Sequence, residues 1–410
     1  MSPLKWVWVL VASAAATPVH AEPLTFDQAM ARAADTAPSL EAAGLRVEAA
    51  RLASRSAGSL PDPQLAFGIE NLPVSGPLAG RFGAAEMNMA GVGLMQDVPS
   101  RPARRAEVER ARAETGVATA RTGTELRAVR LATAEAWLDL HYAQARLAAL
   151  DAIHATLKPI LDTAPSAVAR GARPATTVDP AEWTIALADR RSALMAEATG
   201  ARAALARWTG DPQASPSGEP PRWDIDPALL RAGLVEHSTL EAFAADARLA
   251  DADLAGAKAG LAPDWRWELV YQHRDPAFGD MVSARVTMSL PIRKRDRQGP
   301  QIDARSADAI GARRDLEAAR RQLVANLDAD LATYQMRRDT WGRARDSLLP
   351  LAQRRADLET ASYAAGAASL PEVLAAFTHL ADVRLDVLDK EALAMSDAVR
   401  LNITFGSTGS

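Results

Sequence analysis

Two segments of the chain alternate apolar and polar side chains with a period of two. They are residues 265–272 and 281–290, and residues 274–280 between them have the Pro, Gly and Asp content of a turn. Such alternation is typical of β-strands with one apolar and one polar face. The sequence therefore predicts a β-hairpin, which is barely stable without a partner. Its apolar face is predicted to contain Trp265, Trp267, Leu269, Val282 and Val286.

A second hairpin is predicted about 200 residues earlier in the chain. Its strands are residues 64–70 and 88–98, and its apolar side chains include Leu65, Phe67 and Ile69. Similar Pro-rich segments precede both hairpins, and a proline with several basic residues follows each of them. A repeat at this spacing indicates a duplicated half of the chain rather than a solenoid unit of roughly 20–50 residues. The two hairpins can therefore pair with each other.

Apolar residues spaced by three or four predict that the remainder of each half is helical. Long helices are predicted over residues 101–170 and 301–365, each followed by a Gly-containing turn and a returning helix. The predicted repeats are residues 22–210 and 223–406, and a Pro-, Ser- and Gly-rich linker at 211–222 joins them. The apolar seam of the second long helix is predicted to contain Leu316, Leu323, Leu327, Leu331, Tyr334, Trp341, Leu348, Ala352 and Leu358.

The N-terminal segment, residues 1–21, has the pattern of an export signal. Lys5 provides a positive charge, an apolar core follows, and Val19-His20-Ala21 resembles a cleavage site. The alternative is a membrane anchor, but an apolar core of roughly 11 residues is short for a helix that needs about 20 to span a bilayer. Because no later run is long and apolar enough, we expect that the chain would enter a membrane only as strands.

Composition argues against several classes of function. The chain has no cysteine and a formal net charge of −4, which argues against thiolate metal sites and against a nucleic-acid partner. The histidines are scattered, so no metal or cofactor site is expected. Met87 and Met89 could touch soft cations, although packing or lipid contact is the more ordinary role for them. Without a phosphate loop or a nucleophile motif, no enzymatic activity is expected.

Four strands are too few to close a membrane barrel. An open sheet edge leaves backbone groups unsatisfied in hydrocarbon, and known membrane barrels begin at eight strands. Two chains would supply eight strands and three chains would supply twelve. The alternative is a small soluble sheet docked on the helices. That alternative leaves the apolar side chains without an evident cover within the chain.

Two short motifs make the resemblance to a known family specific. Tyr-Ala-Ala-Gly at residues 363–366, followed by Leu-Pro-Glu-Val-Leu at 370–374, resembles the TolC family of outer-membrane efflux channels. Residues 60–65 and 68–73 are similar to the subgroup that works with heavy-metal RND pumps. The resemblance covers the two tandem halves, in which long coiled-coil-like helices each accompany one β-hairpin.

The resemblance implies a homotrimer, with twelve strands forming a β-barrel in the outer membrane and helices forming an α-barrel across the periplasm. It implies a periplasmic adaptor, an inner-membrane RND pump and outer-membrane lipid as partners. For the two turn glycines, a plain helix C-cap is the simpler alternative. The tips that would engage the adaptor contain Gly171, Arg173, Tyr363, Gly366 and Ser369.

The resemblance also implies an acidic ring at the periplasmic entrance. Glu372 matches an acidic position that lines the entrance in the family, and Asp179 stands near the corresponding position of the first half. Three copies would attract cations and repel one another. Family members often carry a second acid one turn later, where this chain has Ala375, so a double ring is in doubt. A solvated surface acid is the alternative for both residues.

Basic residues cluster where each hairpin passes into a long helix. Arg101, Arg104 and Arg105 follow the first hairpin, and residues 293–297 contain four cations after the second. Contact with anionic headgroups of the periplasmic leaflet is one interpretation. Solvation of a helix start is the other.

Together these observations predict a passive outer-membrane channel of a Gram-negative bacterium, serving a tripartite efflux system for heavy-metal cations. Drug efflux and type I secretion are alternatives within the same class. A periplasmic helical scaffold or adaptor without a pore is an alternative of another class. The chain lacks the β-rich segments that usually flank an adaptor's helical hairpin.

Overall fold

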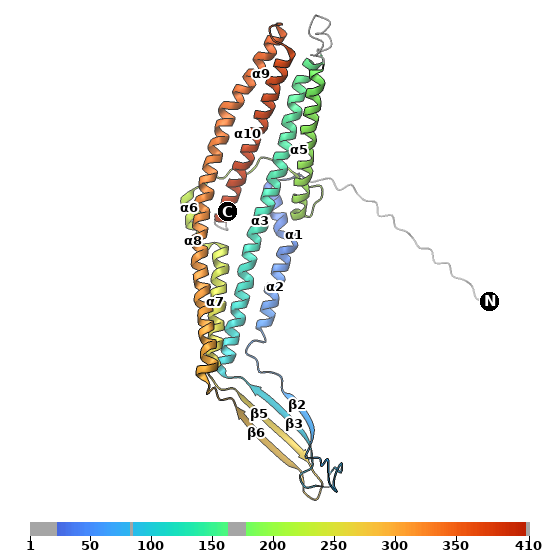
Figure 1. Cartoon of the computed structure of the whole chain (residues 1–410), viewed down its shortest axis with the longest axis vertical. Helices are drawn as coiled ribbons and strands as arrows, with labels where there is room; N and C mark the ends of the chain where they lie inside the picture. The colour runs from blue at the N-terminus through green and yellow to red at the C-terminus, as the bar shows by residue number, and fades with distance from the viewer. Residues whose placement is uncertain (1–22, 83–84, 163–177, 407–410) are drawn as a thin grey trace, which may run out of the picture. The chain divides into compact units, whose positions relative to one another are not determined.

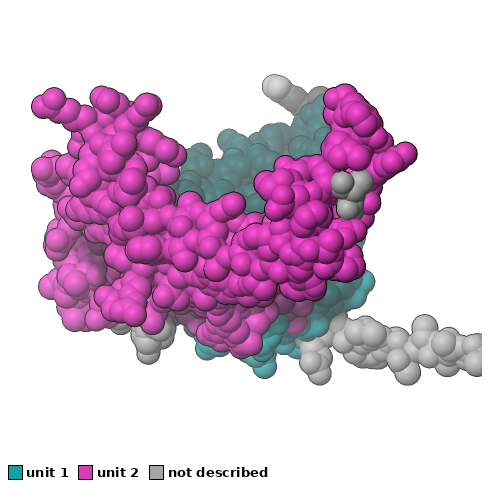
Figure 2. Space-filling view, turned by 90° about the horizontal axis from the view of Figure 1, so that it is seen from below, with its two compact units in different colours: residues 1–35, 132–222, 337–396 teal, residues 36–131, 223–336, 397–410 magenta. Residues whose placement is uncertain are grey.

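The chain folds into two compact units, which Figure 2 shows in two colours. The computed structural model describes residues 23–82, 85–162 and 178–406, so the predicted export signal lies outside the described residues. Each unit draws on both halves of the sequence. Unit 1 comprises residues 1–35, 132–222 and 337–396, and unit 2 comprises residues 36–131, 223–336 and 397–410.

The order of elements repeats along the chain, as the two predicted tandem repeats require (Figure 1). In each repeat two short helices precede a strand hairpin, a long helix follows it, and another helix returns. The first repeat contains α1 (Phe26–Thr36), α2 (Pro38–Ser54), β2 (Gln64–Glu70), β3 (Met89–Val98), α3 (Arg101–Leu161) and α5 (Asp179–Thr209). The second contains α6 (Pro227–Gly233), η2 (Leu234–Glu236), α7 (Ser238–Ala259), β5 (Trp265–His273), β6 (Met281–Met288), η3 (Lys294–Gln298), α8 (Gly299–Arg343), η4 (Ala344–Leu348), α9 (Leu349–Ala364) and α10 (Leu370–Phe405).

The two hairpins form one antiparallel sheet in unit 2, which confirms that they pair with each other. The strand order is β2-β3-β5-β6, so the contact between the two repeats is the β3–β5 ladder. The strand ends agree with the predicted ranges to within two residues. The largest difference is β6, which ends at Met288 rather than at residue 290. Beyond it, the Ser289 N–H donates to the Asp264 carbonyl, and Pro291 has no N–H for a ladder.

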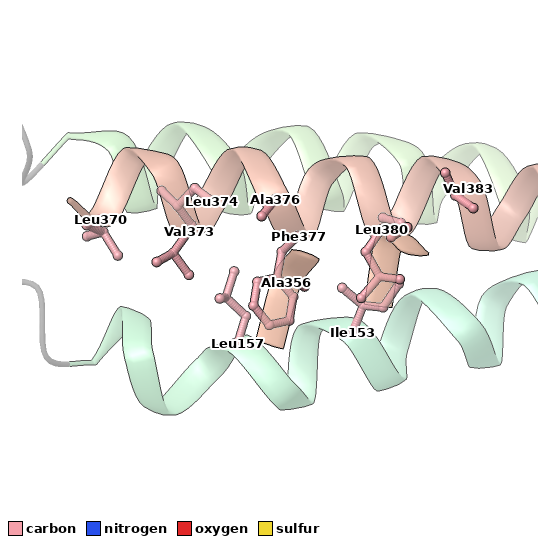
Figure 3. Close-up of a cluster of buried hydrophobic side chains, with 12 residues drawn as sticks. Ile153, Leu157, Ala356, Leu370, Val373, Leu374, Ala376, Phe377, Leu380 and Val383 are labelled. Carbon is pink, nitrogen blue, oxygen red and sulfur yellow. The ribbon is translucent and has the colours of Figure 1, made fainter. Parts of the chain in front are cut away.

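The core of unit 1 lies between α3, α9 and α10 (Figure 3). In the close-up, side chains of α10 point toward Ile153 and Leu157 of α3 and toward Ala356 of α9. Most core residues of each helix are three or four positions apart, so they form one apolar stripe that faces the interior of unit 1. The buried members on α10 are Leu370, Val373, Leu374, Ala376, Phe377, Leu380, Ala381 and Val383.

The start of the described chain is fixed to the segment predicted as a linker. A two-residue strand β1 (Pro23–Leu24) pairs in parallel with β4 (Ser215–Pro216). The Trp137 indole N–H donates to the Leu24 carbonyl at 2.9 Å, and the Trp137 ring meets Phe26 edge-on with centroids 5.6 Å apart. This part of the linker is therefore packed into unit 1 rather than free.

Unit 2 has its own core where α6, η2 and α7 meet residues 323–334 of α8 and the end of α10. It buries Leu327, Leu401 and Phe405 almost completely. A smaller cluster joins α3 to α7 through Val117, Ala120 and Ala245. These contacts pack together the helices of unit 2 that connect to the sheet.

The seam predicted for the second long helix is correct up to Trp341 and wrong beyond it at two positions. Leu348 is 41% exposed and Leu358 is 62% exposed. The π-helical turn η4 adds one residue to a turn of the helix. The inward-facing positions therefore pass from Ala344 to the half-buried Leu349 and then to Ala352 and Ala356, and a constant spacing of three or four fails there.

None of the helices in the described part of the chain combines the length and apolarity needed to cross a membrane.

Candidate functional site: two-faced sheet and helix-tip turn

The register of the sheet gathers its apolar side chains on one surface, here termed the apolar face. In an antiparallel ladder, directly paired residues point to the same side. Leu65 pairs with Leu94, Leu94 pairs with Leu269, and Leu269 pairs with Ala284, so one row crosses all four strands. The face contains Leu65, Phe67, Ile69, Ala90, Val92, Leu94, Gln96, Val98, Trp265, Trp267, Leu269, Tyr271, His273, Val282, Ala284, Val286 and Met288.

The apolar face is exposed within the described chain. Phe67 is 74% exposed, Val286 68% and Val282 66%. Monomeric soluble proteins rarely leave so many large apolar side chains contiguous and uncovered. The eight residues predicted to face lipid all lie on this face and all are exposed: Leu65, Phe67, Ile69, Trp265, Trp267, Leu269, Val282 and Val286. Their contact with lipid itself stays a prediction.

The opposite surface, here termed the polar face, carries hydrogen bonds that cross the strands. Arg266 of β5 donates to Asp97 of β3 at 2.5 and 3.1 Å, and Arg285 of β6 donates to Glu268 of β5 at 3.2 Å. At the loop end of the sheet, the Gln272 amide donates to Glu70 at 3.2 Å, and the Ser283 hydroxyl donates to Gln272 at 3.1 Å. The sheet therefore has one surface suited to an apolar medium and one suited to water.

Val270 is the one apolar side chain that interrupts the polar side of β5. It is half-buried because two glycines of β3 leave room for it. A Cβ on Gly93 would lie 3.2 Å from the Val270 Cγ2, and a Cβ on Gly91 would lie 3.5 Å from its Cγ1. Gly93 thus allows the close approach of Val270 at the ladder that joins the two hairpins, whereas a Cβ on Gly91 would make an ordinary van der Waals contact.

The turn between α9 and α10 is built from a left-handed glycine. Gly366 has a φ of 75°, its N–H donates to the Tyr363 carbonyl, and the Ala367 N–H donates to the Ser362 carbonyl. This pair of hydrogen bonds is the Schellman arrangement, which ends a helix and satisfies its last carbonyls. Tyr363, Gly366 and Ser369, all predicted tip residues, therefore lie within one short turn.

Glu372 is exposed and caps the start of α10. Its Oε2 accepts from the Ser369 N–H at 2.6 Å and from the Ser369 hydroxyl at 2.8 Å. These hydrogen bonds lower the pKa of the Glu372 carboxyl below its usual value, with the backbone donor as the larger cause. A Ser followed three residues later by Glu is the sequence signature of a helix start, and it could have been recognised in advance.

The corresponding turn of the first half is only partly visible. Gly171 and Arg173 lie outside the described residues. Asp179 is the first residue of α5, half-buried, in a first turn that also contains Glu182. The Trp183 indole on the next turn donates to the Thr378 hydroxyl of α10 at 3.1 Å, which joins the starts of α5 and α10. A role of Asp179 or Glu372 at an entrance stays a prediction.

Metal ligands do not converge in the described part of the chain. Within residues 23–82, 85–162 and 178–406, no three His, Asp or Glu side chains are placed to hold one ion. Met87 is exposed, whereas Met89 is 7% exposed on the polar face. The placement of Met87 and Met89 therefore gives no support for a metal-binding role.

Family models, curated proteins and solved structures were each compared with the chain. Residues 29–211 match the family model of the outer membrane efflux protein, so the match lies almost entirely within the first predicted repeat and spans less than half of the chain. None of the curated proteins matches the sequence. The solved structures that resemble the chain span nearly its whole length.

Three of these structures are outer-membrane proteins of bacteria. VceC of Vibrio cholerae is 18% identical with a TM-score of 0.76, over 93% of this chain and 96% of its own. The CmeC channel of Campylobacter jejuni is 12% identical with a TM-score of 0.78, over 99% and 93%. The MtrE channel of Neisseria gonorrhoeae, in its open state, is 15% identical with a TM-score of 0.73, over 93% and 89%.

The chain has the fold of an outer-membrane channel protein. This TolC-like fold confirms the predicted arrangement of tandem helical repeats, each with one hairpin. At identities below 20%, the TolC-like neighbours carry no information on substrate, and the heavy-metal subgroup stays a prediction.

Sequence reasoning missed the hydrogen bonds that cross the polar face. Asp97 and Arg266 are far apart in the chain, and only the β3–β5 register brings them together. The apolar face was recognisable because alternation is a local signal. The pairing between hairpins depends on strand order, which alternation does not encode.

Proposed function

We propose that this chain is the outer-membrane channel of a tripartite RND-type efflux system, a passive conduit whose helices lie in the periplasm. The observation that carries the proposal is the two-faced sheet, in which the edge strands β2 and β6 each have one side unpaired within the described chain. The efflux-family match over residues 29–211 supports the same assignment.

Three copies of the chain would complete the conduit. Strands of seven to ten residues are near the length that a tilted strand needs to cross a bilayer. Since an open edge is not tolerated in hydrocarbon, β6 of one copy would pair with β2 of the next. Twelve strands would then place the apolar face toward lipid and the polar face toward a water-filled lumen.

The far ends of the helices would engage a periplasmic adaptor, and the pump in the inner membrane would supply the energy. The α9–α10 turn with Tyr363, Gly366 and Ser369 supports this role because it is compact and exposes its backbone. Gly171 and Arg173 would act in the same way in the first half. Glu372 and Asp179 would line the entrance, where three carboxylates attract cations.

A matched pair of substitutions on β6 tests the pore. Val286→Arg puts a charge on the apolar face, and its neighbour Thr287→Arg puts the same charge on the polar face. A charge facing lipid costs up to about 2–4 kcal/mol, with the cost falling toward the bilayer interfaces, whereas one facing the lumen is solvated. We expect Val286→Arg to abolish the oligomer that unboiled samples show on gels, and to remove the protein from the outer-membrane fraction. We expect Thr287→Arg to keep both properties and to alter the conductance in planar bilayers.

Equal behaviour of the two variants, or a wild-type chain that is monomeric and freely soluble without detergent, would contradict the pore. In that event a periplasmic scaffold or adaptor would be the better assignment.

We further propose heavy-metal cations as the substrate class, on the resemblance of residues 60–65 and 68–73. The growth of a deletion strain on a panel of divalent and monovalent metals is the test. Sensitivity to metals, relieved by the intact gene, is expected. Sensitivity to drugs alone, or loss of a secreted protein, would instead favour the alternatives within the channel class.

A further inference from the structure

Three of the four connections between the sheet and the helices are tied together at one level. The Ser100 N–H, at the end of β3, donates to the Asp264 carboxylate at 2.7 Å. Asp264, just before β5, exchanges two hydrogen bonds with Ser289, just after β6: its N–H donates to the Ser289 hydroxyl at 2.8 Å, and its carbonyl accepts from the Ser289 N–H at 2.9 Å. The residues that follow these connections therefore start from the same end of the sheet.

Cations concentrate at this level in an otherwise acidic chain. Residues 99–106 contain three arginines and no acid, and residues 289–298 contain four cations and one acid, while the whole chain has a net charge of −4. All are exposed except Arg104, which is half-buried, and none makes an ion pair with another described residue. The group, here termed the junction band, comprises Arg101, Arg104, Arg105, Arg293, Lys294, Arg295 and Arg297.

The start of α3 gains nothing from its charges. The first turn of α3 contains arginines and no acidic residue. The positive end of the helix dipole is at the N-terminus, so cations there are unfavourable and acids are preferred. An external anion would offset this repulsion.

The apolar face ends at the same level with a tryptophan. Val98, Trp265 and Met288 pair in the last row of the sheet, next to Asp264. After β6, Leu290 is 64% exposed and Ile292 is 81% exposed. Tryptophans and exposed apolar residues beside cations are typical of the boundary between hydrocarbon and headgroups.

We propose that the junction band binds anionic glycerophospholipid headgroups of the periplasmic leaflet, while Trp265 lies at the edge of the hydrocarbon. This inference rests on the proposed function, since it requires the sheet to be in the membrane. The ligand is a phospholipid because the band lies at the end of the sheet that leads into the helices, whereas lipopolysaccharide would meet the loop end. Each cation near an anionic surface raises affinity about fivefold at low salt.

Quenching of tryptophan fluorescence by brominated lipid measures whether anionic phospholipids are enriched next to Trp265. The purified full-length chain is placed in phosphatidylcholine bilayers that contain either brominated phosphatidylglycerol or brominated phosphatidylcholine. We expect brominated phosphatidylglycerol to quench several-fold more strongly than brominated phosphatidylcholine. The ratio of the two quenching strengths should approach one near 1 M salt, where charges are screened beyond about 3 Å. The combined Trp265→Phe and Trp267→Phe variant should lose most of the quenching by both lipids.

Two double variants with the same change of charge complete the test. Arg293→Gln with Arg295→Gln should reduce the preference several-fold. Arg354→Gln with Arg355→Gln, exposed residues of α9 in the unit without the sheet, should leave it unchanged. A wild-type preference near one, or equal loss in both double variants, overturns the inference and leaves the channel intact. Absence of quenching by either lipid overturns the proposed function instead.

Discussion

His237 is a buried base at the start of α7 in unit 2. It is 4% exposed, and its Nδ1 accepts the Thr239 N–H at 3.1 Å, so the ring caps the helix. Burial, and then the nearby Arg127 guanidinium, lower the His237 pKa to about 4. The ring must therefore be neutral in the folded chain under ordinary conditions.

The His237 pKa predicts a loss of stability in acid. The unfolded chain takes up a proton on this ring below its ordinary pKa of about 6.5, whereas the folded chain resists until about 4. The stabilising contribution of His237 is therefore complete above pH 6.5 and declines as the pH falls to 4. Melting temperatures across this window should decline less in His237→Asn, because the Asn side chain can cap the helix without titrating. An identical decline in both proteins would exclude His237 as the source.

Two glycines, one in the α9–α10 turn and one inside α8, should respond in opposite ways to substitution by alanine. Gly366→Ala forces a side chain into a φ of 75° and should lower the free energy of unfolding by about 1 kcal/mol. Gly311→Ala, in the interior of α8 with open space around its Cβ, should raise it by about 0.5–1 kcal/mol. Denaturant titration of the two variants measures both changes. The same sign for both would show that the turn tolerates a side chain.

At the scale of elements, the β3–β5 ladder is the connection between the two repeats, and its glycines allow a matched test. Gly93→Leu should crowd Val270, because even a Cβ at that position lies 3.2 Å from it. Gly68→Leu lies on the same face of β2, where a Cβ meets nothing within 4 Å. Overpacking typically costs 1–3 kcal/mol. We expect weaker heat resistance of the oligomer only in Gly93→Leu, and equal effects would argue against close packing at this ladder.

Ion pairs between helices in unit 1 differ in how much they contribute. Arg146 of α3 reaches Glu197 of α5 and Asp389 of α10, each at 2.5 Å, and its side chain is only 16% exposed. Arg146→Ala should lower the free energy of unfolding by about 1–3 kcal/mol, because charged hydrogen bonds are lost from a shielded position. Arg112→Ala breaks an exposed pair with Glu109 and should stay within about 0.5 kcal/mol. Chemical denaturation compares them, and a negligible loss for Arg146→Ala would contradict the assigned role.

Much of the fold could be predicted from local patterns, and the exceptions have physical causes. The strands and long helices were recognisable because their periods of two and of three to four recur along the sequence. The exposure of Leu348 and Leu358 was not, since a constant spacing does not anticipate a π turn, although Pro350 directly after the turn marks a break in the helical hydrogen bonds. The two-residue β1–β4 pairing is too short to leave a period at all.

The sequence predicted some parts of the candidate sites and not others. The residues of the apolar face followed from alternation, and the Gly366 turn followed from its glycine. The hydrogen bonds from Ser369 to Glu372 make this carboxylate part of a helix cap, which the Ser-x-x-Glu spacing could have indicated in advance. Long-range pairs such as Asp97 with Arg266 require the strand order first.

At the scale of the whole molecule, the absence of cysteine makes the proposed assembly directly testable. Ala66→Cys on β2 is combined in turn with Ser283→Cys, Arg285→Cys or Thr287→Cys on β6. These positions share the polar face, and the three β6 sites sample the possible registers between neighbouring copies. Oxidation should give covalently linked dimers and trimers on non-reducing gels in at least one combination.

Single-cysteine variants provide the control, because one thiol per chain cannot link three copies in a ring. Linked species that stop at the dimer in every combination would contradict a closed ring of three.

The π turn η4 has a consequence for comparing this chain with its relatives. Ala344 and then the half-buried Leu349 face the interior, so the helix holds one more residue than a regular repeat would place there. Alignments that assume an unbroken heptad will be displaced by one position from there to Gly366. A gap of a single residue at 344–348 should restore the correspondence and would mark which relatives share the insertion.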